Sequence, residues 1–142
     1  MRAERLTRTL SAWGAAEVSE GSDPWAAIRD VTDFADRPGD VWRLSVRPSR
    51  MGEALALAGG AQRMDWGGGR AWVLVPEGTD LRGRLGAFGT RAALVRASPE
   101  TRDALGTFPP EEPGVAMLSA RLRARFDPRG LFNPGLMAAR AA

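Results

Sequence analysis

The sequence predicts a protein of the α+β class, built on a four-stranded antiparallel sheet. Four short segments alternate apolar and polar residues with the period of a half-buried strand. Two of them flank three consecutive glycines, which is typical of a hairpin, and helical patterns separate the others. With 44% hydrophobic residues, the 142-residue chain can form one core of ordinary size. We therefore expect residues 1–142 to form a single domain.

The order of the elements narrows this prediction. Strands are expected at residues 41–46, 62–66, 70–75 and 91–97. Helical spacing predicts a helix between the first two strands, through Met51, Leu55 and Ala58, and another between the last two, through Leu81, Leu85 and Phe88. The β-α-β-β-α-β order resembles ferredoxin-like folds, in which two helices cover one face of the antiparallel sheet. The other face is expected to be open.

Further helices are expected at both ends of the chain. Before the sheet, helical spacing predicts two short helices, through Leu6, Leu10 and Trp13 and through Trp25, Ile28 and Val31. After the sheet, Ser98 is expected to cap a short helix. A final helix over residues 115–126 places Leu118, Leu122 and Phe126 on one stripe, which we expect to be buried.

Strand alternation assigns polar residues to the open face. Trp42 and Leu44 are expected under the helices, which places Arg43 and Ser45 on the opposite side. Asp65 in the second strand can share that surface. Such a face often does no more than meet water. An RNA-binding sheet would need stacking aromatics on its middle strands, and the third strand offers a single tryptophan, which disfavours that alternative.

The composition excludes several classes of chemistry. The chain has no Cys and no His, which excludes disulfides, thiolate metal sites and cysteine nucleophiles, and removes the commonest general base. All 20 basic residues are Arg, and Lys and Tyr are also absent, so the pI near 11 reflects missing titratable groups. The net charge of +3 is modest and the charges are interspersed along the chain. No nucleic-acid partner is expected.

The hydropathy of the sequence predicts the cellular localisation of the protein. No apolar run approaches the roughly 18 residues that a membrane span requires, so no transmembrane segment is expected. The first residues lack the apolar stretch of a signal peptide. A soluble, cytoplasmic protein is the expectation.

The most specific motif is FDPRGLFNPG, residues 126–135. Its Asp-Pro and Asn-Pro steps disfavour helix and its glycines allow positive φ, which predicts a rigid double turn that presents Leu131 and Phe132. Together with WRLSV followed by Pro, DWGG, and RAALVR after a Gly, this motif resembles the C-terminal domain of the FAD-binding subunit of glycolate oxidase. That subunit belongs to the FAD-linked oxidases of the vanillyl-alcohol-oxidase type. The resemblance covers roughly residues 23–137.

The resemblance implies a division of labour. The chain would be the cap domain, which lays its sheet over the isoalloxazine of a flavin-binding domain and shapes the substrate pocket. The flavin-binding domain is absent from this chain, which has no GxGxxG motif, so FAD is expected in the full-length context and not bound to this chain alone. The implied partners are the flavin-binding domain, the other glycolate oxidase subunits and a small 2-hydroxy acid. A surface made to cover another domain is also expected to self-associate when exposed.

The resemblance also selects candidate site residues. Those for substrate binding are Arg43, Ser45, Asp65 and Arg91, and the one for cofactor binding is Asn133, in the segment that returns to the flavin domain. Arg91 stands where the family commonly has a His, and its guanidinium can bind a carboxylate in bidentate fashion. No catalytic residue and no metal site are expected in this chain.

The expected function is therefore the substrate or cap domain of a glycolate-oxidase-type, FAD-dependent 2-hydroxy-acid oxidoreductase subunit, inactive without its flavin domain. The alternative is a freestanding ferredoxin-like binding or structural module without catalysis. A neighbouring reading frame that encodes a flavin domain would favour the first, and an isolated frame would favour the second.

Overall fold

The computed structural model describes residues 2–15, 17–18, 21, 23–88 and 91–132. The chain divides into two units, Met1–Ala35 and Asp36–Ala142. The second unit contains all four strands and the candidate site residues on them.

The first unit is helical. Helix α1 spans Arg2–Leu10, helix α2 spans Asp23–Asp30, and a 3-10 turn, η1, spans Thr32–Phe34. The sequence predicts an apolar stripe that continues along α2 to Val31, but the helix ends one residue earlier. Val31 has a φ of 52° in the left-handed region, which is costly for a β-branched residue and breaks the helical run before η1.

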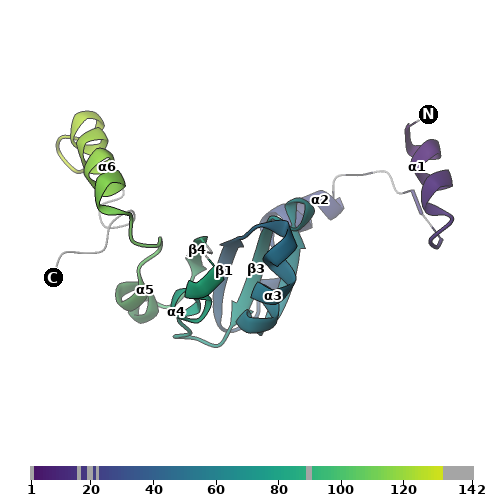
Figure 1. Cartoon of the computed structure of the whole chain (residues 1–142), viewed down its shortest axis with the longest axis horizontal. Helices are drawn as coiled ribbons and strands as arrows, with labels where there is room; N and C mark the ends of the chain where they lie inside the picture. The colour runs from purple at the N-terminus through teal and green to yellow at the C-terminus, as the bar shows by residue number, and fades with distance from the viewer. Residues whose placement is uncertain (1, 16, 19–20, 22, 89–90, 133–142) are drawn as a thin grey trace. The chain divides into compact units, whose positions relative to one another are not determined.

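The second unit is built on a four-stranded antiparallel sheet. Its strands are β1 Asp40–Ser45, β2 Ala61–Asp65, β3 Arg70–Val75 and β4 Arg91–Arg96, in the order β2-β3-β1-β4. Helix α3, Pro48–Ala58, connects β1 to β2, and helix α4, Leu81–Leu85, lies between β3 and β4, followed by the 3-10 turn η3, Gly86–Phe88 (Figure 1). The predicted α+β class and β-α-β-β-α-β order are confirmed, and the arrangement is compatible with a ferredoxin-like fold.

The core lies between the two helices and one face of the sheet. Trp42 and Leu44 of β1 are fully buried there, together with Leu55 of α3 and Leu81 and Leu85 of α4. Arg43 and Ser45, which alternate with them along β1, are exposed. The predicted register of β1 is therefore confirmed.

Side-chain caps fix the first turns of two short helices. The carboxylate of Asp80 accepts hydrogen bonds from the backbone N–H of Arg82 at 3.0 Å and of Gly83 at 3.1 Å, at the start of α4. The hydroxyl of Ser98 accepts one from the N–H of Thr101 at 3.2 Å, which begins helix α5, Pro99–Leu105. Each cap satisfies N–H groups that the first turn of a helix leaves without a partner.

Arg82 ties α4 to β4 and to the segment after α5. Its side chain donates hydrogen bonds to four backbone carbonyls, those of Ala92 at 2.9 Å, Leu105 at 2.5 Å, Gly106 at 3.1 Å and Thr107 at 2.7 Å. Its guanidinium also lies over the ring of Trp42. Burial lowers the pKa of Arg82, because desolvation disfavours the charged form, and the carbonyls compensate that charge.

The hairpin between β2 and β3 departs from the predicted strand. Trp66 does not extend β2 but begins a 3-10 turn, η2, Trp66–Gly68, with a φ of 54°. Its side chain is 74% exposed. Met64 faces the helix side of the sheet but is also exposed, because β2 is an edge strand.

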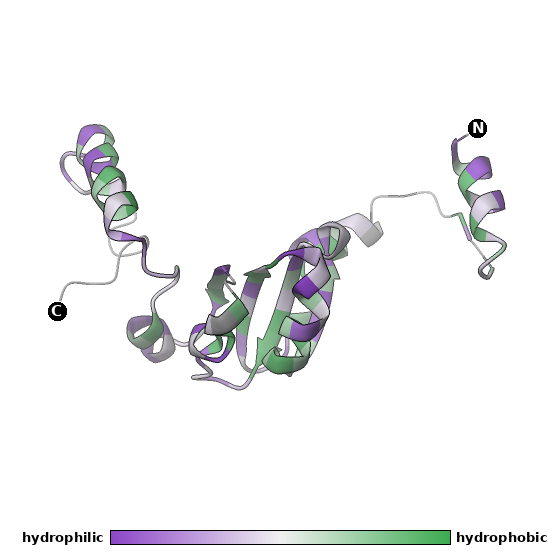
Figure 2. Ribbon diagram, in the orientation of Figure 1, coloured by the Kyte–Doolittle hydropathy of each residue, from purple (hydrophilic) through white to green (hydrophobic). Residues whose placement is uncertain are grey.

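Helix α6, Pro113–Phe126, forms as predicted but has no buried residue. The stripe of Leu118, Leu122 and Phe126, expected to be buried, is 57%, 59% and 78% exposed. Figure 2 shows hydrophobic and hydrophilic residues interleaved along this helix. The prediction of a buried stripe was therefore wrong: helical spacing identifies an apolar face, whereas burial needs a partner surface.

A compact turn follows α6. Both carboxylate oxygens of Asp127 accept backbone hydrogen bonds, from Leu131 at 2.9 Å and from Phe132 at 2.8 Å. Gly130 supports this turn with a φ of 61°, and its N–H donates to the carbonyl of Asp127. The predicted turn is therefore present up to Phe132, the last described residue, with Leu131 and Phe132 exposed.

No helix in the described part of the chain combines the length and the apolar character needed to cross a membrane.

Candidate functional site

A row of polar side chains crosses the whole sheet. Asp65 of β2 lies opposite Arg70 of β3, Arg70 lies opposite Ser45 of β1, and Ser45 lies opposite Arg91 of β4. Directly opposed residues of antiparallel strands project from the same face of a sheet. All four side chains therefore belong to the face that α3 and α4 leave uncovered.

Arg43 belongs to the same face, because it precedes Ser45 by two residues on β1. It lies opposite Trp72 of β3 and Ala93 of β4. The structure thus places Arg43, Ser45 and Asp65 on one face of the sheet, as the sequence predicts, and adds Arg91 to that face. We call the exposed set Arg43, Ser45 and Arg91 the arginine-serine cluster.

The polar end of this face is bounded by buried apolar residues. Val41, Leu74 and Ala93 alternate with the core residues of their strands and face away from α3 and α4, yet they are at most 8% exposed. They are separate from the core under the two helices. The exposed part of the face is therefore the end that carries the arginine-serine cluster.

Asp65 and Arg70 form an ion pair at the β2 side of the row. Nη2 of Arg70 lies 2.5 Å from Oδ2 of Asp65, and Oδ1 of Asp65 accepts a hydrogen bond from the N–H of Trp66 at 2.7 Å. The hydrogen bond from Arg70, followed by that from Trp66, lowers the pKa of Asp65. The charge of Arg70 is thus neutralised within the chain.

Trp66 covers the other side of this ion pair. The Cζ atom of Arg70 lies 4.4 Å from the centroid of the Trp66 ring. A cation held over an aromatic face is attracted to the ring, and the contact helps to hold Trp66 in its left-handed conformation. Arg70 therefore pairs with Asp65 on one side and contacts the ring of Trp66 on the other.

Arg43 and Arg91 differ from Arg70 in their charge balance. Among the described residues, no carboxylate and no hydrogen-bond acceptor pairs with either guanidinium. They are diagonal neighbours on adjacent strands, since Ser45 lies opposite Arg91 and two positions from Arg43. Diagonal neighbours are about 7–8 Å apart at Cα, a spacing that long side chains can bridge. The cluster can therefore present two guanidiniums and a hydroxyl to one small anion.

The glycine-rich loop of the hairpin differs from the loops that hold a pyrophosphate. The glycine-rich loop at residues 67–69 joins two strands through the three-residue turn η2 and opens no α-helix, whereas pyrophosphate cradles place such glycines at a helix N-terminus. Helix α3 follows β1 but begins with Pro48, which has no N–H to donate. The candidate cofactor contact, Asn133, lies outside the described residues.

The sequence prediction missed Arg70 and Trp72 as members of this face. Both could have been found from alternation, since they precede and follow Ala71, which is buried against the helices. The four residues between Asp65 and Arg70 also place these opposite charges at the two ends of a hairpin loop. The left-handed conformation of Trp66 leaves no comparable signal in the sequence.

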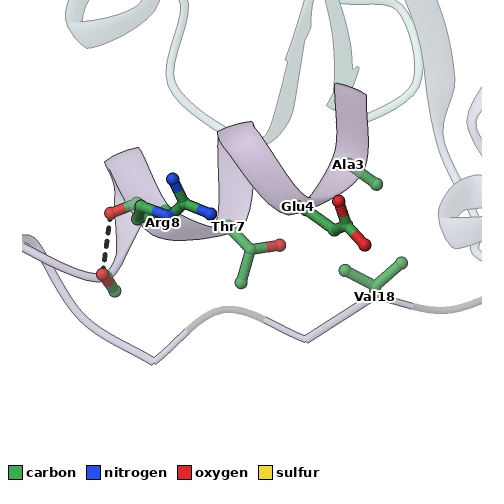
Figure 3. A pocket seen from close by; sticks show the side chains of 6 residues that line it. Ala3, Glu4, Thr7, Arg8 and Val18 are labelled. Atoms are coloured by element: carbon green, nitrogen blue, oxygen red, sulfur yellow. Dashed lines mark hydrogen bonds between the residues drawn. The ribbon is translucent and has the colours of Figure 1, made fainter. Parts of the chain in front are cut away.

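A separate hollow lies in the first unit. It has a volume of about 540 Å³ and lies between α1 and the segment that follows it, lined by Ala3, Glu4, Thr7, Arg8, Ser11 and Val18 (Figure 3). The hydroxyl of Ser11 donates to the carbonyl of Arg8 at 2.8 Å. None of the predicted site residues lines this hollow.

No protein family matches the chain, and no curated protein or solved structure matches it either.

Proposed function

We propose that this chain is the substrate or cap domain of a glycolate-oxidase-type, FAD-dependent 2-hydroxy-acid oxidoreductase in the cytoplasm. It acts with a flavin-binding domain and is inactive without it. The observation that carries the proposal is the arginine-serine cluster at the exposed end of the open sheet face. A 2-hydroxy acid offers a carboxylate and a hydroxyl, which are the two groups that this cluster is able to bind.

The cluster would bind and orient the substrate. A guanidinium pairs with a carboxylate through two parallel hydrogen bonds, which fixes orientation as well as charge. Arg43 is the main candidate, because it projects from the central strand β1 beside the half-buried ring of Trp72. The hydroxyl of Ser45 can donate to or accept from the substrate hydroxyl. The redox chemistry would belong to the flavin of the partner domain.

The end of the chain supports docking on such a partner. The turn closed by Asp127 holds Leu131 and Phe132 in place, although they are 59% and 75% exposed. Exposed apolar groups on a fixed turn suit contact with another protein surface. In the proposed role, this turn and the apolar face of α6 contact the flavin-binding domain.

The test is flavin content in two preparations. The purified 142-residue chain mixed with FAD should bind no stoichiometric flavin, whereas the tagged protein isolated from its source cells should carry about one flavin per chain. A yellow complex formed from the chain and FAD alone would contradict the proposal. A tagged chain that is isolated without flavin, alone or as a self-associated species, would favour the freestanding module.

A further inference from the structure

Two positive charges of the open sheet face have no counterpart in the described chain. Arg70 is paired with Asp65 at 2.5 Å, and Arg63 lies close enough to Asp65 to lower the pKa of that carboxyl. Arg43 and Arg91 pair with no carboxylate among the described residues. One end of the sheet thus carries two unneutralised guanidiniums on adjacent strands.

The proposed function places this end of the sheet in a pocket under a partner domain. Removal from water raises the free energy of an unpaired guanidinium. In water, two exposed guanidiniums are well solvated and screened. Once a partner domain covers the face, a guanidinium without an anion is buried and unpaired, which is strongly unfavourable. A monocarboxylate can neutralise one of the two charges and leaves the other uncompensated.

We infer that the ligand of this site carries two acidic groups, as a small 2-hydroxy dicarboxylate does. This inference rests on the proposed function and specifies its substrate class. Arg43 binds one carboxylate and Arg91 the other, while Ser45, opposite Arg91 and two residues from Arg43, meets the 2-hydroxyl.

A matched pair of acids tests the inference on the chain itself. Malate and 2-hydroxybutyrate share a four-carbon chain and a 2-hydroxyl, and differ in one carboxylate in place of a methyl group. Each is titrated into the isotope-labelled 142-residue chain at matched low ionic strength, with the signals of Arg43, Ser45 and Arg91 followed by NMR. Malate should bind about fivefold more tightly, the factor expected for one additional exposed ion pair.

Variants test whether Arg91 binds the second carboxylate of malate. Arg91→Gln should lower the affinity for malate to within about twofold of the affinity for 2-hydroxybutyrate. The affinity for 2-hydroxybutyrate itself should not change, since losses at independent contacts add. Arg121→Gln, which removes the same charge from helix α6, should leave both affinities unchanged. All these arginines are exposed, so thermal melting should show that the variants fold.

The outcomes separate the inference from the proposed function. If both acids shift the cluster with equal affinity, the second acidic group is refuted, while the 2-hydroxy acid site stands. If inorganic phosphate binds as tightly as malate, the affinity follows the total charge of the anion and not the presence of two separate acidic groups. That result would contradict the inference. If neither acid shifts Arg43 or Ser45, the cluster binds no 2-hydroxy acid, and the assignment of the substrate carboxylate to Arg43 is contradicted.

Discussion

The guanidinium of Arg82 lies over the indole ring of Trp42, with 4.9 Å between Cζ and the ring centroid. The contact joins a partly buried cation to the largest side chain of the core, at the point where α4 meets β1. The same guanidinium and its Nε donate to four backbone carbonyls, so Arg82 connects elements that are distant in sequence. It positions the sheet from the side opposite the arginine-serine cluster.

Replacing Arg82 should therefore destabilise the fold. Arg82→Gln removes most of these hydrogen bonds and leaves carbonyls without donors, for an expected loss of about 3 kcal/mol. Arg84→Gln is the control, because Arg84 donates to one carbonyl, that of Ala58 at 2.8 Å, and should cost about 1 kcal/mol. Urea unfolding measures both. Equal losses of unfolding free energy for the two variants would show that the additional hydrogen bonds of Arg82 do not stabilise the fold.

Neighbouring residues of β1 should respond in opposite ways to truncation. Trp42→Ala removes a fully buried side chain and should lower the free energy of unfolding by about 3–5 kcal/mol. Arg43→Ala removes an exposed side chain and should change it by less than about 0.5 kcal/mol. Thermal or urea denaturation gives both values. A large loss at Arg43 with a small one at Trp42 would mean that the strand faces are reversed.

Phe126→Ala should have little effect on the isolated chain. Phe126 is 78% exposed, so the expected change in unfolding free energy is below about 0.5 kcal/mol. Leu85→Ala is the reference, since Leu85 is 1% exposed in the core and should cost about 3 kcal/mol. Comparable losses at the two positions would show that the stripe of α6 is buried in solution.

The turn after α6 should depend on pH. Two backbone hydrogen bonds, from Phe132 and Leu131, lower the pKa of Asp127. Because the pKa is lower in the turn than in an unfolded chain, the stabilisation of the turn is complete above the unfolded value of about 3.9. It is lost as the pH falls through the lower pKa of the folded turn.

The amide signals of Leu131 and Phe132 should therefore shift together with the side-chain titration of Asp127, at a pH below its ordinary pKa. In Asp127→Ala the same amides should show no such titration, and their signals should already be those of an open turn at neutral pH. Amides of Leu131 and Phe132 that ignore the titration of Asp127 in the unmodified chain would rule out this hydrogen-bonded turn.

Much of the sheet could be predicted from the sequence, because strand alternation is a local signal. The segment from Trp42 to Ser45 alternates cleanly, and its faces are those predicted. The helix after Ser98 also follows from a local signal, the preference of serine for the N-cap position. The sheet face that carries Arg43 and Ser45 could therefore be predicted from the sequence alone.

The remaining features depend on contacts between elements or on special backbone geometry. The pairing of Arg70 with Asp65 follows from the register of the hairpin, and the left-handed conformation of Trp66 follows from its tight turn. Helical spacing in α6 reveals an apolar face, but the spacing carries no information about which surface covers it. For that reason the exposure of Phe126 could not be predicted.

The central claim is that Arg43 holds the carboxylate of a 2-hydroxy acid, and flavin bleaching in the complex with the flavin-binding partner tests it most directly. Arg43→Gln removes a charge-assisted bidentate contact, worth about 1.5–3 kcal/mol, and should slow substrate-dependent bleaching at low substrate concentration by about tenfold or more. The control, Arg2→Gln, removes an exposed charge from helix α1 and should bleach at the unmodified rate. Equal bleaching rates for Arg43→Gln and the unmodified complex would contradict the account.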